Sequence, residues 1–63
     1  MNCYILYKTD DKTVLSFIAQ DIHEQYVPAE GQSVTSNYLE FEKDELPDMN
    51  KVMVDENGLG KKK

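Results

Sequence analysis

The sequence predicts a mainly β, or β-rich α+β, fold: a small antiparallel meander of three to four strands with one short helical turn. Three observations indicate this class. Two apolar runs flank a polar link near the N-terminus, residues 36–43 alternate between apolar and polar, and residues 51–54 form a short apolar run before a turn. We expect a single β-rich domain over residues 1–60, followed by a frayed, basic tail over residues 61–63.

The first two elements are predicted to form a hairpin. The segment NCYILY (2–7) is rich in aromatic and β-branched residues, as strands are. The link KTDDKT (8–13) carries turn-forming residues, so the run VLSFIA (14–19) should return antiparallel to the first strand. Neither run alternates cleanly with polar residues, which predicts that both faces of the hairpin are covered.

The remaining elements are shorter. Asp21 and Glu24 have the spacing of a capping box, and Ile22 and Tyr26 share one helical face, so we expect one or two helical turns before Pro28. The segment PAEG should then turn. Strand 36–43 should end near Pro47, and strand 51–54 should lead into a DENG turn, where glycine adopts positive backbone angles at little cost.

The core is predicted from strand alternation. Leu15 and Phe17 share one face of the second run, with Val14 on the opposite face, and Leu39 and Phe41 share the apolar face of the third. We therefore expect Leu15, Phe17, Leu39 and Phe41 to lie on a shared core.

Composition restricts the partners. Seven lysines, no arginines and twelve acidic residues give a formal charge of −5, which disfavours nucleic-acid phosphates and anionic lipid as direct partners. No apolar run approaches the roughly 20 residues that span a membrane, and no signal peptide is recognisable. A reducing cytoplasm is the predicted compartment. Cys3, the only cysteine, permits no internal disulfide and is expected to be a buried, unreactive thiol.

Metal binding and catalysis are not predicted. An EF-hand loop needs an oxygen ligand at its fifth position, but a loop starting at Asp48 has Val52 there and one starting at Asp55 has Leu59. Cys3 and His23 alone do not make a zinc site. His23 should lie solvated on a surface turn, and no nucleophile, base and orienting group are grouped in the sequence. We expect no cofactor and no enzyme.

Acidic residues gather in the C-terminal half, and they admit two interpretations. Glu40 and Glu42 lie on one face of the predicted strand and Asp44 follows it. Such a row is either a charged outer face that prevents edge-to-edge aggregation, or an imitation of a phosphate backbone that occupies the nucleic-acid site of a basic protein.

The order of segments resembles a known class of small proteins. A YILYKTDDKTVLSFIA hairpin, then PAEGQS, then YLEFEKDELPDMNKVMVDENG is similar to proteins encoded in tail-module regions of phages and prophages of Gram-positive bacteria. The resemblance implies a non-enzymatic protein that works through protein contacts, as a structural or accessory component in the cytoplasm of a host cell or in a virion. The same genomes encode small acidic inhibitors of host nucleases and immune systems, so the alternative is an inhibitor of a host defence or nucleic-acid-processing protein.

Association is expected through the hairpin. One of its apolar faces covers the core, and the strands that follow are too short to cover the other. We predict a homodimer, or a complex with another protein, with Tyr4 and Leu6 as contact residues and strand 2–7 at a sheet edge. The alternative is that the turn carrying Ile22 and Tyr26 folds over this face. With the carboxylates, the predicted partner-binding residues are Tyr4, Leu6, Glu40, Glu42 and Asp44.

Overall fold

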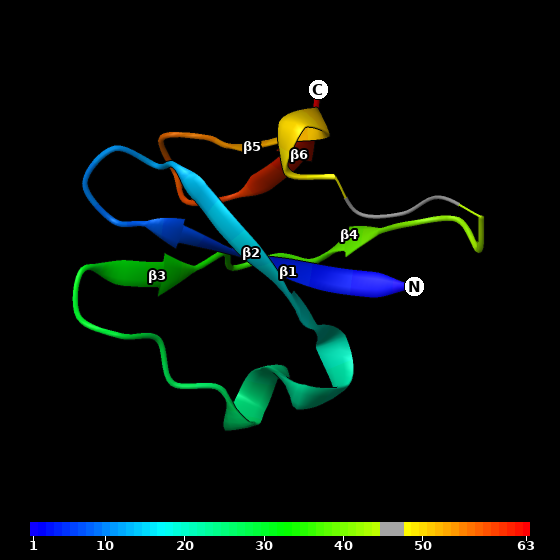
Figure 1. Cartoon of the computed structure of the whole chain (residues 1–63), viewed down its shortest axis with the longest axis horizontal. Coiled ribbons are helices and arrows are strands. Elements are labelled where there is room, and N and C mark those ends of the chain that lie inside the picture. Colours follow the sequence, from blue (N-terminus) through cyan, green and yellow to red (C-terminus); the bar gives the residue numbers. More distant parts are fainter. Residues whose placement is uncertain (45–47) are drawn as a thin grey trace.

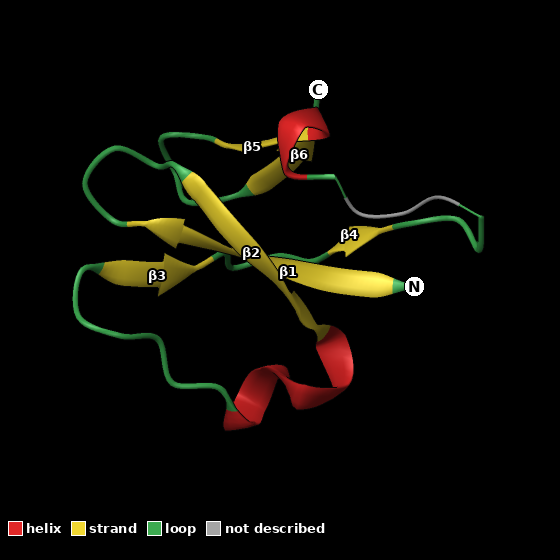
Figure 2. Ribbon diagram, in the orientation of Figure 1, coloured by secondary structure: helices red, strands yellow, loops and turns green. Residues whose placement is uncertain are grey.

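Two antiparallel sheets form the molecule, shown in Figure 1 and, coloured by secondary structure, in Figure 2. The computed structural model describes residues 1–44 and 48–63. The mainly β class is confirmed. The elements, in order, are β1 (Asn2–Lys8), β2 (Val14–Ala19), the 3₁₀ helix η1 (Gln20–Gln25), β3 (Gln32–Val34), β4 (Leu39–Glu40), the 3₁₀ helix η2 (Met49–Lys51), β5 (Val52–Val54) and β6 (Gly60–Lys62).

Strand β1 is the centre of the larger sheet. The predicted β1–β2 hairpin is confirmed, and on its other side β1 pairs with β3 through its C-terminal half and with β4 through its N-terminal half. The chain therefore crosses from one side of β1 to the other through η1, and the sheet is not the simple meander that we expected. The prediction that strand 2–7 lies at a sheet edge is wrong, because β1 is paired on both sides.

A register shift in the hairpin changes which residues of β2 face the core. Ile5 lies opposite Phe17 and Leu6 opposite Ser16, but Tyr7 lies opposite Val14, so Leu15 is an extra residue in β2. An extra residue of this kind reverses the alternation of side chains on its far side, here at Val14. Val14 therefore shares the core face with Phe17, contrary to the simple alternation predicted from sequence.

The second sheet is a hairpin of β5 and β6. The DENG turn is confirmed, with Gly58 at a φ of 78°, and Val54 pairs with Gly60. The expected frayed tail at 61–63 is wrong, because Lys61 and Lys62 belong to β6 and the Lys63 N–H donates to the Lys51 carbonyl at 2.8 Å. Positions 61–63 are part of the fold.

The core lies between the two sheets. Its buried residues are Cys3, Ile5, Tyr7, Phe41, Val52 and Val54, against which Val14, Phe17 and Leu39 pack. Phe17 and Phe41 meet edge to face at 5.9 Å between ring centroids. The shared core is thus confirmed for Phe17, Leu39 and Phe41, whereas Leu15 lies outside this cluster because of the bulge. Cys3 is buried, as predicted.

The predicted strand 36–43 is mostly replaced by a bent segment. Only Leu39 and Glu40 form a strand, and sequence reasoning missed β3 (Gln32–Val34) altogether. Between them Thr35 keeps contact with β1: its N–H donates to the Ile5 carbonyl at 3.0 Å, and its Oγ1 accepts from the Ile5 N–H at 3.1 Å. The expected break at Pro47 lies outside the described residues.

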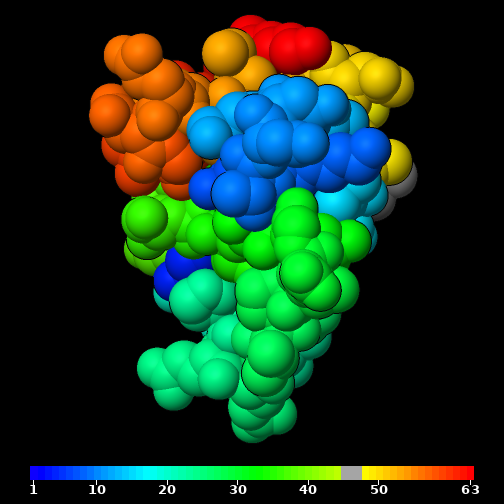
Figure 3. Space-filling model, turned by 90° about the vertical axis from the view of Figure 1, so that its left-hand side faces the viewer, coloured from blue at the N-terminus to red at the C-terminus, as the bar shows by residue number. Residues whose placement is uncertain are grey.

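The helical turn covers the outer face of the hairpin, but not through the residues that we expected. η1 begins after Ala19, which supplies no side-chain cap, so the capping box at Asp21 is wrong. Ile22 and Tyr26 are exposed, whereas the His23 ring stacks on Tyr4 at 3.6 Å between centroids. Figure 3 shows this turn projecting at the end of the molecule opposite the β5–β6 hairpin.

Candidate functional site

The predicted contact residues of the hairpin are not available as an open patch. Leu6 is 8% exposed and Tyr4 is half-buried. The Tyr4 ring lies under His23 and meets the Tyr38 ring edge-on at 6.0 Å. Because η1 and Tyr38 already cover this face, the premise that it needs a cover from a second molecule is wrong.

The predicted acidic residues are all exposed, but they do not form one site. Glu40 and Asp21 line a shallow hollow of about 620 Å³ beside the N-terminus. Asp44 instead lines a different and larger groove, and Glu42 lies between the two along the chain. The acidic residues are therefore divided between two surfaces, and neither includes Tyr4 or Leu6.

The larger groove, of about 870 Å³, runs between β2 and the η2–β5–β6 segment. We call it the β2 groove. Its apolar side chains come from segments that are far apart in sequence: Leu15, Phe17, Phe41, Met49 and Val52. Phe41 and Val52 are buried in the core and Met49 is 49% exposed, so the groove runs from the core to the surface. A concave apolar lining of this size is typical of a binding surface.

Lysines border the β2 groove. Lys51, Lys62 and Lys63 line it, together with Asp44 and Asp48. The pairing of β6 with β5 explains this placement: Lys62 lies opposite the buried Val52, on the core-facing side of the hairpin, and its Nζ sits 4.8 Å from the centre of the Phe41 ring. The described lining of the groove thus holds three lysines and two aspartates, in a protein of net charge −5.

The backbone of β2 has a free edge beside the groove. In an antiparallel pair, successive residues direct their N–H and C=O alternately toward the partner strand and away from it. Both backbone groups of Ile5 bond to Thr35, on the far side of β1, so Ile5 and its partner Phe17 do not bond each other. The N–H and C=O of Phe17 therefore face away from β1. In the described sheet β2 is the last strand on this side.

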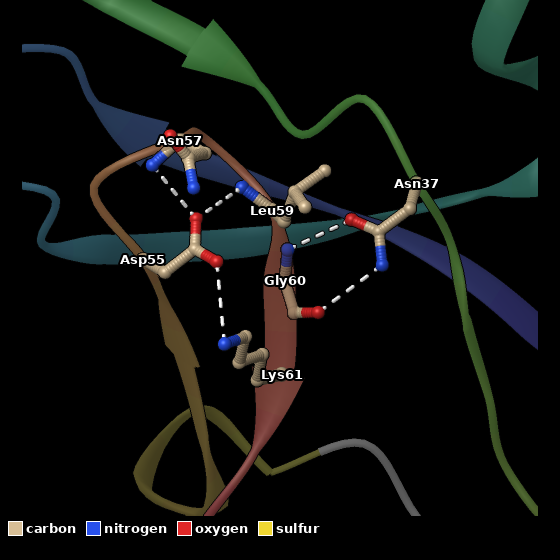
Figure 4. Close-up of polar contacts among 6 residues, drawn as sticks. All are labelled: Asn37, Asp55, Asn57, Leu59, Gly60 and Lys61. Atoms are coloured by element: carbon tan, nitrogen blue, oxygen red, sulfur yellow. Dashed lines mark hydrogen bonds and ion pairs between the residues drawn. The ribbon is translucent and has the colours of Figure 1, made fainter.

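The C-terminal turn uses its carboxylate for structure. Asp55 Oδ1 accepts from the N–H groups of Asn57 and Leu59, each at 2.9 Å, and Oδ2 lies 3.4 Å from Lys61 Nζ (Figure 4). These interactions favour the charged form, and the bond from the Leu59 N–H contributes most to lowering the pKa of Asp55 from its ordinary value of 3.8. Asp55 therefore holds the turn of the hairpin that carries the lysines.

The turn between β1 and β2 is built in a similar way. The Thr13 N–H donates to Asp11 Oδ1 at 3.0 Å, and hydrogen bonding by Thr13 lowers the pKa of Asp11. Lys12 within this turn has a positive φ of 64°. This end of the hairpin fixes the start of β2 and thus the position of Leu15.

The groups with chemical reactivity lie apart. Cys3 is 4% exposed on the core face of β1, and His23 packs on the opposite face, so His23 is not the solvated side chain that we expected. No group of three or more His, Cys, Asp or Glu side chains is arranged to hold a metal ion within residues 1–44 and 48–63. Among the described parts of the chain, no helix is long and apolar enough to cross a membrane.

Sequence reasoning missed the β2 groove for identifiable reasons. Strand alternation predicts Leu15 in the core, and the bulge that displaces it has no strong sequence signal. The sequence predicts a frayed tail for residues 61–63. The available signal was the DENG turn, which ends at the first glycine of GLG. A turn of this kind after one short strand predicts a second strand and thus a hairpin.

Comparison with known proteins gives no relative. The chain matches no protein-family model, no curated protein and no solved structure.

Proposed function

We propose that this protein is non-enzymatic and acts by contact with another protein, as a structural or accessory component of the phage tail-module type. The observation that carries the proposal is the β2 groove: an apolar hollow bordered by Lys51, Lys62 and Lys63, beside an edge of β2 that pairs with no other strand of the described residues. Surfaces that combine a buried apolar centre with a charged rim are typical of protein interfaces. The resemblance of the segment order to tail-module proteins supports the phage setting, in a host cell or a virion.

The contact surface in this proposal differs from the one predicted from sequence. Self-association through Tyr4 would need its ring to leave the cover of His23 and Tyr38, and Leu6 is itself buried. The β2 groove needs no such rearrangement, because Leu15 and Met49 already line an open surface.

Affinity capture with matched variants tests the function. Leu15→Lys places a charge in the apolar lining, and Val27→Lys adds the same charge at a position that is 85% exposed and does not line the groove. Wild type and Val27→Lys should enrich the same protein from lysate of the host, and Leu15→Lys should lose it by about tenfold or more, as expected for a buried contact.

Two results would count against the proposal in different ways. If wild type enriches no protein over empty resin, the function is wrong. If all three forms enrich the same protein equally, the function stands but the contact lies outside the β2 groove.

The second candidate is an acidic inhibitor of a basic host protein. It is favoured by Glu40 and Asp21, which come from separate elements and line one hollow, with exposed Glu42 nearby in the chain. Binding of this kind is steered by charge and weakens with salt. Binding of the basic host protein would be lost in the double variant Glu40→Lys with Glu42→Lys and kept in Leu15→Lys. The two candidate functions involve different faces of the protein, and these variants distinguish them.

A further inference from the structure

We propose that the β2 groove binds an extended, acidic segment of a partner protein, which adds to the larger sheet as a strand beside β2. The inference rests on the proposed function and specifies the chemistry of the partner. Three features of the site lead to it: the backbone of β2, the apolar lining and the lysines.

The backbone requires an extended partner. The N–H and C=O of Phe17 point away from β1, and alternate residues of an edge strand present the same groups. A chain in β conformation can bond to these groups without any change in the sheet, which is the mode known as strand addition. A helix bonds its interior N–H and C=O groups to itself and leaves such groups free only at its two ends, so it cannot pair along β2.

The lining sets the side chains of that partner. Phe17 faces the core side of the sheet, where its ring meets Phe41 and where Val52 and Met49 complete the groove wall. A strand beside β2 would direct every second side chain to this wall. These positions should be apolar, and the intervening positions should face solvent at the mouth of the groove, where Lys51 and Lys63 are exposed.

The lysines set the charge. Lys51 and Lys63 are exposed at the groove and are held next to each other by the bond from the Lys63 N–H to the Lys51 carbonyl, while Lys62 lies over Phe41. Asp44 and Asp48 also line the groove, and Asp48 Oδ1 is engaged by the Asn50 N–H at 2.9 Å. Among the described residues that line the groove, three are lysines and two are aspartates, although the whole chain is acidic. Carboxylates on the partner complement them over the short range at which charges act in physiological salt.

A defined peptide tests the inference directly. The probe is an acetylated, amidated hexapeptide that alternates glutamate with valine, titrated into isotopically labelled full-length protein and followed by amide chemical shifts. The charge control replaces each glutamate by lysine. The backbone control carries N-methyl groups on alternate residues, which remove the donors needed for strand pairing.

We expect the shift changes to centre on β2, with Phe17 prominent, and on Lys51 and Lys63. The acidic peptide should bind about tenfold more tightly than the lysine peptide, as complementary charge predicts. The form N-methylated on the residues that pair should lose binding by about tenfold or more, because it cannot donate.

Charge reversal supplies the matched variants. Lys51→Glu with Lys63→Glu should invert the preference, so that the lysine peptide binds better than the acidic one. Lys8→Glu reverses one charge on β1 away from the groove and should leave the preference unaltered.

In the titrations, the inference is overturned if the acidic and lysine peptides bind equally, if the amide chemical-shift changes are confined to η1, or if a single-stranded oligonucleotide binds more tightly than the acidic peptide. It is also overturned if light scattering shows a stable dimer and a second copy protects the β2 amides. If Lys51→Glu with Lys63→Glu aggregates and the wild type binds neither peptide, the lysines only prevent aggregation through the edge of β2. Failure here, combined with Leu15-dependent capture of a protein from lysate, would leave the proposed function intact.

Discussion

Thr35 replaces a strand residue at the point where the chain bends away from β1. It is 2% exposed, its Oγ1 accepts from the Ile5 N–H, and the same hydroxyl donates to the Asn37 carbonyl at 2.8 Å. One side chain thus satisfies two backbone groups in the space between β3 and β4. Because the N–H and C=O of Ile5 both bond to Thr35, the N–H and C=O of the opposite residue Phe17 face away from β1.

Removing this hydroxyl should destabilise the protein. Thr35→Val keeps the shape but leaves the buried Ile5 N–H without an acceptor, which costs about 1–3 kcal/mol of unfolding free energy. Thr35→Ser keeps the hydroxyl and loses only a methyl group, worth about 0.8 kcal/mol. Amide exchange distinguishes the two effects: the Ile5 N–H should exchange faster in Thr35→Val and remain protected in Thr35→Ser. Equal protection in both variants would show that another group accepts this bond.

Among the elements, the β5–β6 hairpin depends on a carboxylate in its turn. Asp55 accepts two backbone bonds and lies near Lys61, and its pKa is lowered in the folded protein. A lowered folded-state pKa contributes stability above the ordinary value of 3.8, and this contribution is lost as the pH falls through the folded-state pKa.

We therefore expect acid to weaken this hairpin through Asp55. Melting temperature measured from about pH 6 to about pH 2 should fall less steeply in Asp55→Asn than in wild type, because the variant has no charge to lose. Glu56→Gln, in the same turn but exposed, is the control and should follow the wild-type profile. Parallel profiles for wild type and Asp55→Asn would contradict this role.

How far each element could be predicted depends on where its determinants lie. The β1–β2 hairpin is encoded locally, by two apolar runs and a polar link, and it was predicted with its bounds nearly correct. β3 is a strand because Leu6, Tyr7 and Lys8 offer it an edge, and QSV carries little strand signal of its own. The 3₁₀ turn lies where predicted, but the choice of His23 over Ile22 and Tyr26 as the covering side chain depends on the position of Tyr4.

The candidate site was harder to predict, because it forms only when distant segments meet. Leu15 reaches the β2 groove through a bulge, and Lys62 reaches it through a strand that looked like a tail. The acidic residues, by contrast, could be placed on the surface from sequence because alternation with Leu39 and Phe41 fixes their direction. The division of these acidic residues between two surfaces could not be predicted from sequence, because it depends on how the chain turns after β4.

At the scale of the whole molecule, Phe41 joins the two sheets. It is 4% exposed, meets Phe17 of β2 edge to face, and lies beneath Lys62 of β6. The sheets are further linked by Asn37, whose side chain accepts from the Gly60 N–H at 2.8 Å and donates to the Gly60 carbonyl at 3.1 Å (Figure 4). Gly60 packs so closely that a Cβ there would lie 2.8 Å from Ile5 Cδ1.

Phe41→Ala should therefore unfold much of the population. Removing a buried phenyl ring costs about 3–5 kcal/mol, and a core of this size supplies only about 3–5 kcal/mol of net stability. Urea denaturation followed by circular dichroism measures the loss, and Met53→Ala, on a side chain that is 43% exposed, is the control. A cooperative Phe41→Ala transition with an unchanged midpoint would show that the ring does not hold the sheets together.

The central place of β1 has a consequence for how fast the chain folds. β2 follows β1 directly and a hairpin of this kind closes in about 1–10 μs. Pairing on the other side of β1 requires Thr35, which lies 30 residues along the chain from Ile5. Domains dominated by such distant pairings fold in about milliseconds to seconds, so the docking of residues 32–40 onto β1 should set the folding rate. A substitution in the β1–β2 turn, which is already formed when residues 32–40 dock, would then alter the folding rate more than the unfolding rate.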